Sequence, residues 1–168
     1  YSNLYYKNNN FYSDSACSNS TGITKMSEAV ARMTSSGKIH MLSQYASSAD
    51  ETVTVLSGRN VTVLRESSFT NASMFKITGG TFKVNAPKTN SSITFDGKSL
   101  TATANFNGGA FDVGGDSGKL ELNGASDSTR NIILQNNRAN KGAVWDSITN
   151  HGGAIYVESQ GGGVTCNN

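Results

Sequence analysis

The chain alternates short apolar runs with glycine- or amide-rich breaks, and one plan of this kind occurs three times. It occupies residues 74–85, 108–124 and 152–167, each with an apolar strand, a glycine-rich break and a second apolar strand. A unit of this size cannot bury its own apolar side, so such repeats stack on one another. The repetition therefore predicts an all-β fold of the β-solenoid kind.

Apolar and polar residues alternate with a period of two over most of the chain after Lys38, which is typical of strands. The expected strands span 38–42, 52–56, 60–64, 75–78, 81–84, 92–95, 110–113, 119–122, 131–134, 143–145, 154–157 and 163–166. The loops between them vary in length, as stacked repeats tolerate. We take Val53, Phe75, Phe111 and Ile155 as corresponding positions of successive units.

Equivalent strands of stacked units should pair in parallel, about 4.8 Å apart. One interior column is then expected to contain Phe75, Phe111 and Ile155. A second column is expected to contain Phe82, Leu120 and Val164.

One helix is predicted, over residues 24–34. Met26, Val30 and Met33 form an apolar stripe, and Thr24 is placed to cap the first amides. Residues 1–23 are rich in Tyr and Asn and are expected to cover the first coil, as a small hairpin or an irregular segment. Residues 24–168 then hold the capping helix and about four coils.

Several segments resemble right-handed parallel β-helix proteins of the pectin-lyase-like superfamily. Residues 26–42 and 52–65 resemble the opening of that fold, where a short N-terminal capping helix precedes the first coil. The Gly-Gly-Ala-containing segments 107–111 and 151–157, and residues 134–144, are similar to repeats of chlamydial polymorphic membrane proteins and related surface proteins. The resemblance implies a right-handed β-helix and a large extracellular adhesin or passenger, of which this chain would be the N-terminal section.

The amino-acid composition also favours an extracellular location. The 168 residues include 18 glycines, carry a formal net charge of +2 and are 15% charged. This charge gives no reason to expect nucleic acid as a partner. No apolar run approaches the roughly 20 residues of a transmembrane helix. We expect an extracellular or cell-surface protein with no cofactor.

Three functions are compatible with these features. The first is a non-enzymatic, adhesin-like or structural protein whose partner is a host or environmental glycan or a surface receptor. The second is a self-assembling filament or sheath subunit, for which further copies of the chain are the partner. The third is a polysaccharide lyase or glycoside hydrolase, because β-helix enzymes of these classes exist.

Catalytic and metal-binding groups are not evident from the spacing of residues. Asp112, Glu121 and Glu158 occupy outward strand positions without a paired-carboxylate signature, so we expect no catalytic residue. His40 and His151 have no ligand partners at metal-binding spacing, and a zinc site needs about four donors. We therefore expect no metal site.

Two residue groups remain as candidates for contact with partners. Trp145, Tyr156 and Tyr45 are aromatic residues that could stack on a glycan. Cys17 and Cys166 lie near opposite ends of the chain. A disulfide needs Cα atoms within about 7 Å, so the two thiols are expected to be free or buried, with an intersubunit bond or an N-terminal segment that reaches Cys166 as the alternatives.

Overall fold

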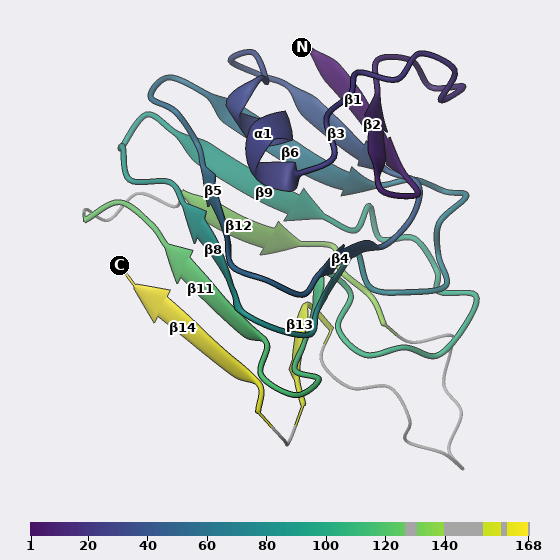
Figure 1. Cartoon of the computed structure of the whole chain (residues 1–168), viewed down its shortest axis with the longest axis vertical. Helices are drawn as coiled ribbons and strands as arrows, with labels where there is room; N and C mark the ends of the chain where they lie inside the picture. Colours follow the sequence, from purple (N-terminus) through teal and green to yellow (C-terminus); the bar gives the residue numbers. More distant parts are fainter. Residues whose placement is uncertain (127–130, 140–152, 159–160, 168) are drawn as a thin grey trace.

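The computed structural model describes residues 1–126, 131–139, 153–158 and 161–167 of the chain. Within them, the chain forms short strands in three sheets and one helix, α1 (Met26–Ala31). Sheet A contains β12 (Ile132–Gln135), β9 (Ser92–Asp96), β6 (Asn60–Arg65), β3 (Lys38–Met41), β1 (Asn3–Lys7) and β2 (Asn10–Tyr12), in that order. Figure 1 shows β3, β6, β9 and β12 of sheet A following one another along the molecule.

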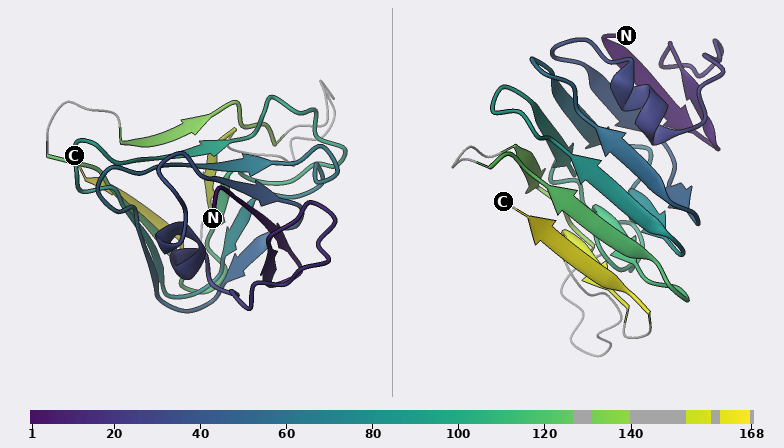
Figure 2. Two further views of the ribbon diagram at one scale, coloured as in Figure 1. Left: turned by 90° about the horizontal axis from the view of Figure 1, so that it is seen from above. Right: turned by 60° about the vertical axis from the view of Figure 1, so that its left-hand side comes forward.

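Sheets B and C have four strands each. Sheet B contains β13 (Ile155–Val157), β10 (Phe111–Val113), β7 (Phe75–Ile77) and β4 (Tyr45–Ser47), in that order. Sheet C contains β14 (Gly163–Asn167), β11 (Lys119–Asn123), β8 (Thr81–Asn85) and β5 (Glu51–Thr54), in that order. From β3 on, three consecutive strands enter sheets A, B and C in turn; we call each such set a layer. Viewed from above, the three sheets surround the interior (Figure 2).

The expected fold, one right-handed parallel β-helix, is wrong. The described strands lie in separate parallel sheets of six, four and four strands, and each strand has only three to six residues. The N-terminal pair, β1 and β2, is antiparallel. The repeats predicted which strands are neighbours, but the breaks between apolar runs end each strand after a few residues. The course of the chain through these breaks therefore decides which sheet each strand joins. The alternation of apolar and polar residues does not reveal that course.

The predicted interior columns are present. Phe111 is in register with both Phe75 and Ile155, and the Phe75 and Phe111 rings stack with centroids 4.9 Å apart. Leu120 is likewise in register with Phe82 and Val164. Burial of these apolar side chains against one another stabilises the stacked strands.

One predicted correspondence was wrong, because a strand was missed. The residue in register with Phe75 is Tyr45, on β4, whereas Val53 pairs with Val84 in sheet C. The sequence Tyr-Ala-Ser of β4 has no apolar alternation, since Ser47 occupies an inward position although it is polar. Tertiary packing thus overrides a weak local strand preference.

The N-terminal segment is part of sheet A. β1 pairs in parallel with β3 and forms a hairpin with β2. Of the two alternatives expected for the N-terminal segment, the small hairpin is the one that the structure contains. Helix α1 is shorter than the predicted 24–34 and buries Met26, Ala29 and Val30. Lys25 is its N-cap residue and makes no side-chain capping bond, so the expected cap by Thr24 is absent.

The layer formed by β12, β13 and β14 contains the last strand of each sheet, and we call it the end layer. Its inward positions hold Ile132, Leu134, Ile155, Val157, Val164 and Cys166, in register with buried residues of the preceding layer. None of the six is fully buried, and Val157 is 41% exposed. The interior columns therefore continue into a layer whose far side is incompletely covered.

Candidate functional site

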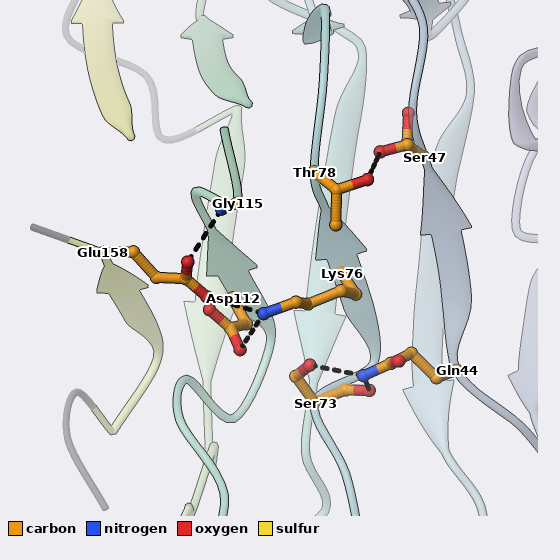
Figure 3. Close-up of polar contacts among 8 residues, drawn as sticks. All are labelled: Gln44, Ser47, Ser73, Lys76, Thr78, Asp112, Gly115 and Glu158. Carbon is orange, nitrogen blue, oxygen red and sulfur yellow. Dashed lines mark hydrogen bonds and ion pairs between the residues drawn. The ribbon is translucent and has the colours of Figure 1, made fainter. Parts of the chain in front are cut away.

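The most concentrated set of charged side chains on the described surface crosses sheet B. Lys76 on β7 extends its Nζ to Asp112 Oδ2 on β10, at 2.8 Å, and to Glu158 Oε1, at 2.6 Å. Glu158 immediately follows β13, so three consecutive strands are linked (Figure 3). We call these three residues the lysine–carboxylate cluster.

The sequence places this cluster through register and a glycine pair. Lys76 and Asp112 each follow a buried phenylalanine, and the two residues are direct partners between β7 and β10. Glu158 lies beyond Tyr156, which is the partner of Asp112, and its side chain turns back over Gly114 and Gly115. A Cβ atom on Gly114 would lie 2.3 Å from Glu158 Cβ. The glycine therefore leaves the space that Glu158 occupies.

A backbone amide completes the contacts of Glu158. The Gly115 N–H donates to Glu158 Oε2 at 2.7 Å, so each oxygen of this carboxylate accepts one hydrogen bond. Asp112 is only 8% exposed, and its Oδ1 has no hydrogen-bond partner. A buried carboxylate oxygen without a donor is costly. The two carboxyl groups thus share one ammonium but have different environments.

These environments move the two carboxyl pKa values in opposite directions. Burial raises the pKa of Asp112, and this effect, with the nearby charge of Glu158, outweighs the bond from Lys76. The hydrogen bonds from Lys76 and Gly115 lower the pKa of Glu158. Burial alone would lower the pKa of Lys76, but its bonds to both carboxylates outweigh burial and raise it. One lysine cannot fully compensate two carboxylates, so Asp112 is the more easily protonated of the pair.

Other polar contacts on the outer faces also join successive layers. Lys83 on β8 lies 3.2 Å from Glu121 on β11. Asn85, Asn123 and Asn167 are in register on sheet C, and their amides form a ladder with N–O distances of 2.8 and 2.7 Å. Such amide ladders stabilise stacked parallel strands.

Three hydrogen bonds beside the cluster extend the pattern across sheet B. Gln44 Nε2 donates to Ser73 Oγ at 2.8 Å and to the Ser73 carbonyl, and Thr78 Oγ1 donates to the Ser47 carbonyl (Figure 3). Each bond connects segments that neighbour one another in the sheet. The polar side chains of this face therefore bind mainly to one another and to the backbone.

The predicted glycan-contact residues do not form one surface. Tyr45 is 3% exposed and its ring packs in the interior against Phe75, so it is not accessible for stacking on a glycan. Tyr156 is half-buried beside Asp112 in sheet B. Trp145 lies outside the described residues.

Cys17 and Cys166 form no disulfide with one another in the described chain. Cys17 lies in the segment after the β1–β2 hairpin and is partly exposed, whereas Cys166 is exposed on β14. Cys166 occupies an inward position of the end layer, in register with Leu122. Its exposure therefore reflects the incomplete cover of that layer.

His40 has an acidic partner that sequence spacing did not reveal. His40 Nδ1 lies 2.5 Å from Glu66 Oε1, and Nε2 lies 3.0 Å from Asn3 Oδ1. The imidazole also stacks on Tyr5, with ring centroids 4.5 Å apart. These contacts join β1, β3 and the residue that follows β6 in sheet A. His151 lies outside the described residues.

A buried arginine, Arg65, is a second feature that was not expected from the sequence. The Arg65 guanidinium donates to the carbonyls of Phe69 and Gly109, at 2.9 and 2.8 Å, and lies over the rings of Phe69 and Phe106. Burial lowers the pKa of Arg65 to about 10. Because Arg65 follows the alternation of β6, its inward position could have been read from the sequence, but its carbonyl partners come from loops.

A shallow open groove of about 410 Å³ crosses sheet C. It is lined by residues of β8, β11 and β14, among them Thr81, Lys119, Glu121 and Thr165. Hydroxyl and charged side chains of this kind can bind sugar hydroxyls. Of the aromatic candidates Tyr45 and Tyr156, neither lines this groove.

Comparisons with protein-family models, curated proteins and solved structures found no match to this chain. No helix among the described residues is long and apolar enough to cross a membrane. The same residues contain no group of three or more His, Cys, Asp and Glu side chains arranged to hold a metal ion. The functional assignment therefore rests on the chain's own contacts.

Proposed function

We propose that the chain is a non-enzymatic extracellular or cell-surface protein with an adhesin-like or structural role. The observation that supports this best is the lysine–carboxylate cluster, because its three charged groups bind one another across β7, β10 and β13. General acid–base cleavage of a glycosidic bond needs two carboxyl groups that face the substrate. Here both face the same lysine, and Asp112 is buried.

The external location is supported by composition. The chain is rich in Asn, Ser, Thr and Gly and only 15% of its residues are charged, and polar contacts such as the amide ladder on sheet C join the layers. A glycan or a surface receptor remains the proposed partner. The groove across sheet C, with Lys119 and Glu121 on neighbouring positions, offers hydrogen-bonding groups for such a ligand.

The test separates binding from cleavage. The purified chain is incubated with pectin, alginate and related glycans, and both retention of each glycan and release of products are measured. We expect no product, and retention that decreases in the Glu121→Ala variant if the groove binds sugars. Product release by the wild type that is lost in Asp112→Asn or Glu158→Gln would overturn the proposal in favour of a carbohydrate-active enzyme.

Self-assembly is the second candidate function, and the end layer favours it. Six inward positions of this layer are incompletely buried, and Val157 and Cys166 are exposed. Exposed strand edges and apolar side chains are typical sites of pairing with another chain.

A further inference from the structure

The geometry points to a covalent cross-link between Lys76 and Asp112, a side-chain amide formed with loss of water while Glu158 carries the proton. This inference goes beyond the proposed function and does not depend on it. It follows from three features of the lysine–carboxylate cluster: the distances, the burial of Asp112, and the different proton affinities of the two carboxyl groups.

The reacting groups are already in contact. Lys76 Nζ lies 2.8 Å from Asp112 Oδ2, on a directly paired strand. Holding two groups at about 3 Å replaces an encounter in solution by a reaction within one molecule, which accounts for large rate gains in intramolecular reactions. The β-sheet fixes this geometry, because Lys76 and Asp112 have the same register positions on β7 and β10.

Burial favours the amide over the free acid and amine. Asp112 is 8% exposed, and its Oδ1 is enclosed without a hydrogen-bond donor. An ionised carboxylate in such a place is destabilised, whereas an amide carbonyl carries no charge to desolvate. Conversion to the amide consumes the ammonium and one carboxylate together, so the net charge of the cluster stays the same. The product leaves a single negative charge on Glu158.

The two carboxyl groups have the properties that the reaction requires of them. The protonated carboxyl is the electrophile, and burial raises the pKa of Asp112. Glu158 is the proton acceptor: hydrogen bonds from Lys76 and Gly115 lower its pKa, which keeps it ionised but makes it a weak base, so its contact with the Lys76 nitrogen carries this role. Glu158 lies 2.6 Å from the Lys76 nitrogen, within reach of its proton.

The step balances without any other reactant. Glu158 takes a proton from the Lys76 ammonium, and the neutral amine attacks Cγ of the protonated Asp112 to form a C–N bond. The Asp112 C–O bond then breaks, and its hydroxyl leaves as water with the proton that Glu158 returns. The nitrogen loses its remaining extra proton to Glu158 or to solvent, so the products are one amide and one water molecule, and no oxidant or reductant is needed.

Lys83 and Glu121 provide an internal comparison. This pair also joins paired positions of neighbouring strands, but its N–O distance is 3.2 Å, its lysine is more exposed, and a single carboxylate is involved. Glu121 therefore has no second carboxylate to act as base. The inference predicts a cross-link at Lys76 and none at Lys83.

Mass spectrometry tests the inference on the purified, folded chain. The intact mass under denaturing conditions should be lower than the sequence mass by one water molecule. Tryptic digestion should leave the Lys76 site uncleaved and give a branched peptide that joins the segments around Lys76 and Asp112. Cleavage after Lys83 should be normal.

Matched variants separate this cross-link from other losses of mass. Lys76→Arg keeps the positive charge but has no attacking amine of the same kind, and Glu158→Gln removes the base, so both should have the full sequence mass. Asp112→Asn should lose ammonia instead of water. A succinimide at Asp96-Gly97 would also lose water, but it would persist in Lys76→Arg. Circular dichroism confirms that each variant is folded.

A wild-type chain with the full sequence mass and normal cleavage after Lys76 would overturn the inference and leave an ion pair only. The inference would also be overturned if the Lys76→Arg variant showed the same loss of one water molecule as the wild type. The branched peptide in the wild type, together with its absence in Glu158→Gln, would establish both the bond and the role of the base.

Discussion

Individual residues in this chain serve mainly to connect strands that are distant in sequence. Asp96, at the end of β9, illustrates this. It accepts the backbone N–H of Lys98 at 2.7 Å and the side-chain amides of Gln135 and Asn136 from the next layer. Burial alone would raise the pKa of Asp96, but these three hydrogen bonds outweigh burial and lower it.

The lowered pKa of Asp96 makes a prediction about acid stability. A depressed folded-state pKa contributes stability above the unfolded value, near 3.8, and this contribution is lost as pH falls through the folded pKa. Asp96→Asn should therefore lower the free energy of unfolding by about 1 kcal/mol at neutral pH. The difference between this variant and the wild type in the free energy of unfolding should shrink in acid. Urea denaturation at neutral pH and at acid pH measures this difference.

Gln135→Ala is the companion variant, because it removes one of the hydrogen-bond donors that bind Asp96. It should weaken the dependence of the free energy of unfolding on pH. An Asp96→Asn deficit of the same size in acid and at neutral pH would show that the carboxylate charge is not what matters there.

At the scale of the element, helix α1 depends on side chains of β4 and β5. Tyr45 donates its hydroxyl to Glu51 Oε1 at 2.5 Å and accepts the Met26 N–H at 3.0 Å. Glu51 Oε2 accepts the Ser27 N–H at 2.9 Å. Burial, together with the bond to Glu51, raises the pKa of Tyr45. The first amides of a helix need acceptors, and a carboxylate near them is favourable.

Tyr45→Phe should therefore destabilise the protein although it keeps the aromatic packing. The Met26 N–H would lose its acceptor in a buried place, so we expect a loss of about 1–3 kcal/mol in the free energy of unfolding. Chemical denaturation followed by circular dichroism measures this. The matched control is Tyr1→Phe, because Tyr1 is 41% exposed, and its effect should stay within about 0.5 kcal/mol. Equal effects of the two variants would contradict the proposed anchoring of α1.

Sequence patterns were informative at this scale where alternation is strong. The strands around Phe75, Phe111 and Leu120 were predicted together with their register. β4 was missed because Tyr-Ala-Ser lacks alternation. The N-terminal capping of α1 was assigned to Thr24, whereas the acceptors come from Glu51 and Tyr45, which are distant in sequence. Local rules describe local capping and cannot identify a partner that folding brings near.

At the scale of the whole molecule, the two ends of the stack differ. One end is covered by α1 and the β1–β2 hairpin, with Met26, Val30 and Phe11 buried. The other end is the end layer, with Val157 and Cys166 exposed. Figure 2 shows α1 and β14 at opposite ends of the stacked strands.

If the end layer mediates self-assembly, Val157→Lys should reduce it, since a charge would have to be buried in the contact. Light scattering over a range of concentrations measures the oligomeric state, and alkylation of Cys166 should slow as assemblies form. Leu56→Lys is the matched control, because Leu56 is 43% exposed and lies after β5, outside the end layer. Wild-type monomers at all concentrations would exclude self-assembly through this layer.

The lysine–carboxylate cluster also depends on the arrangement of the whole molecule. Asp112 and Glu158 were expected to point outward without forming a carboxylate pair. Asp112 is in register with Tyr156, two residues before Glu158, so the two carboxyl groups are not on directly paired positions. The side chain of Glu158 turns back over Gly114 and Gly115, and Lys76 reaches both carboxylates. Register fixes where Cα atoms lie, whereas the direction and length of side chains decide which charged groups meet.

The amino-acid sequence by itself determined most of the described strands from β3 on, with their neighbours and most of the side chains in the interior columns, because these follow from alternation and repetition along the chain. Tertiary structure alone decided that the strands form three sheets, that Tyr45 is inside, and that Lys76, Asp112 and Glu158 form one cluster. The physical reason is that alternation reports which side of a strand is buried. The turns between strands and the reach of long side chains depend on the space left by the other layers.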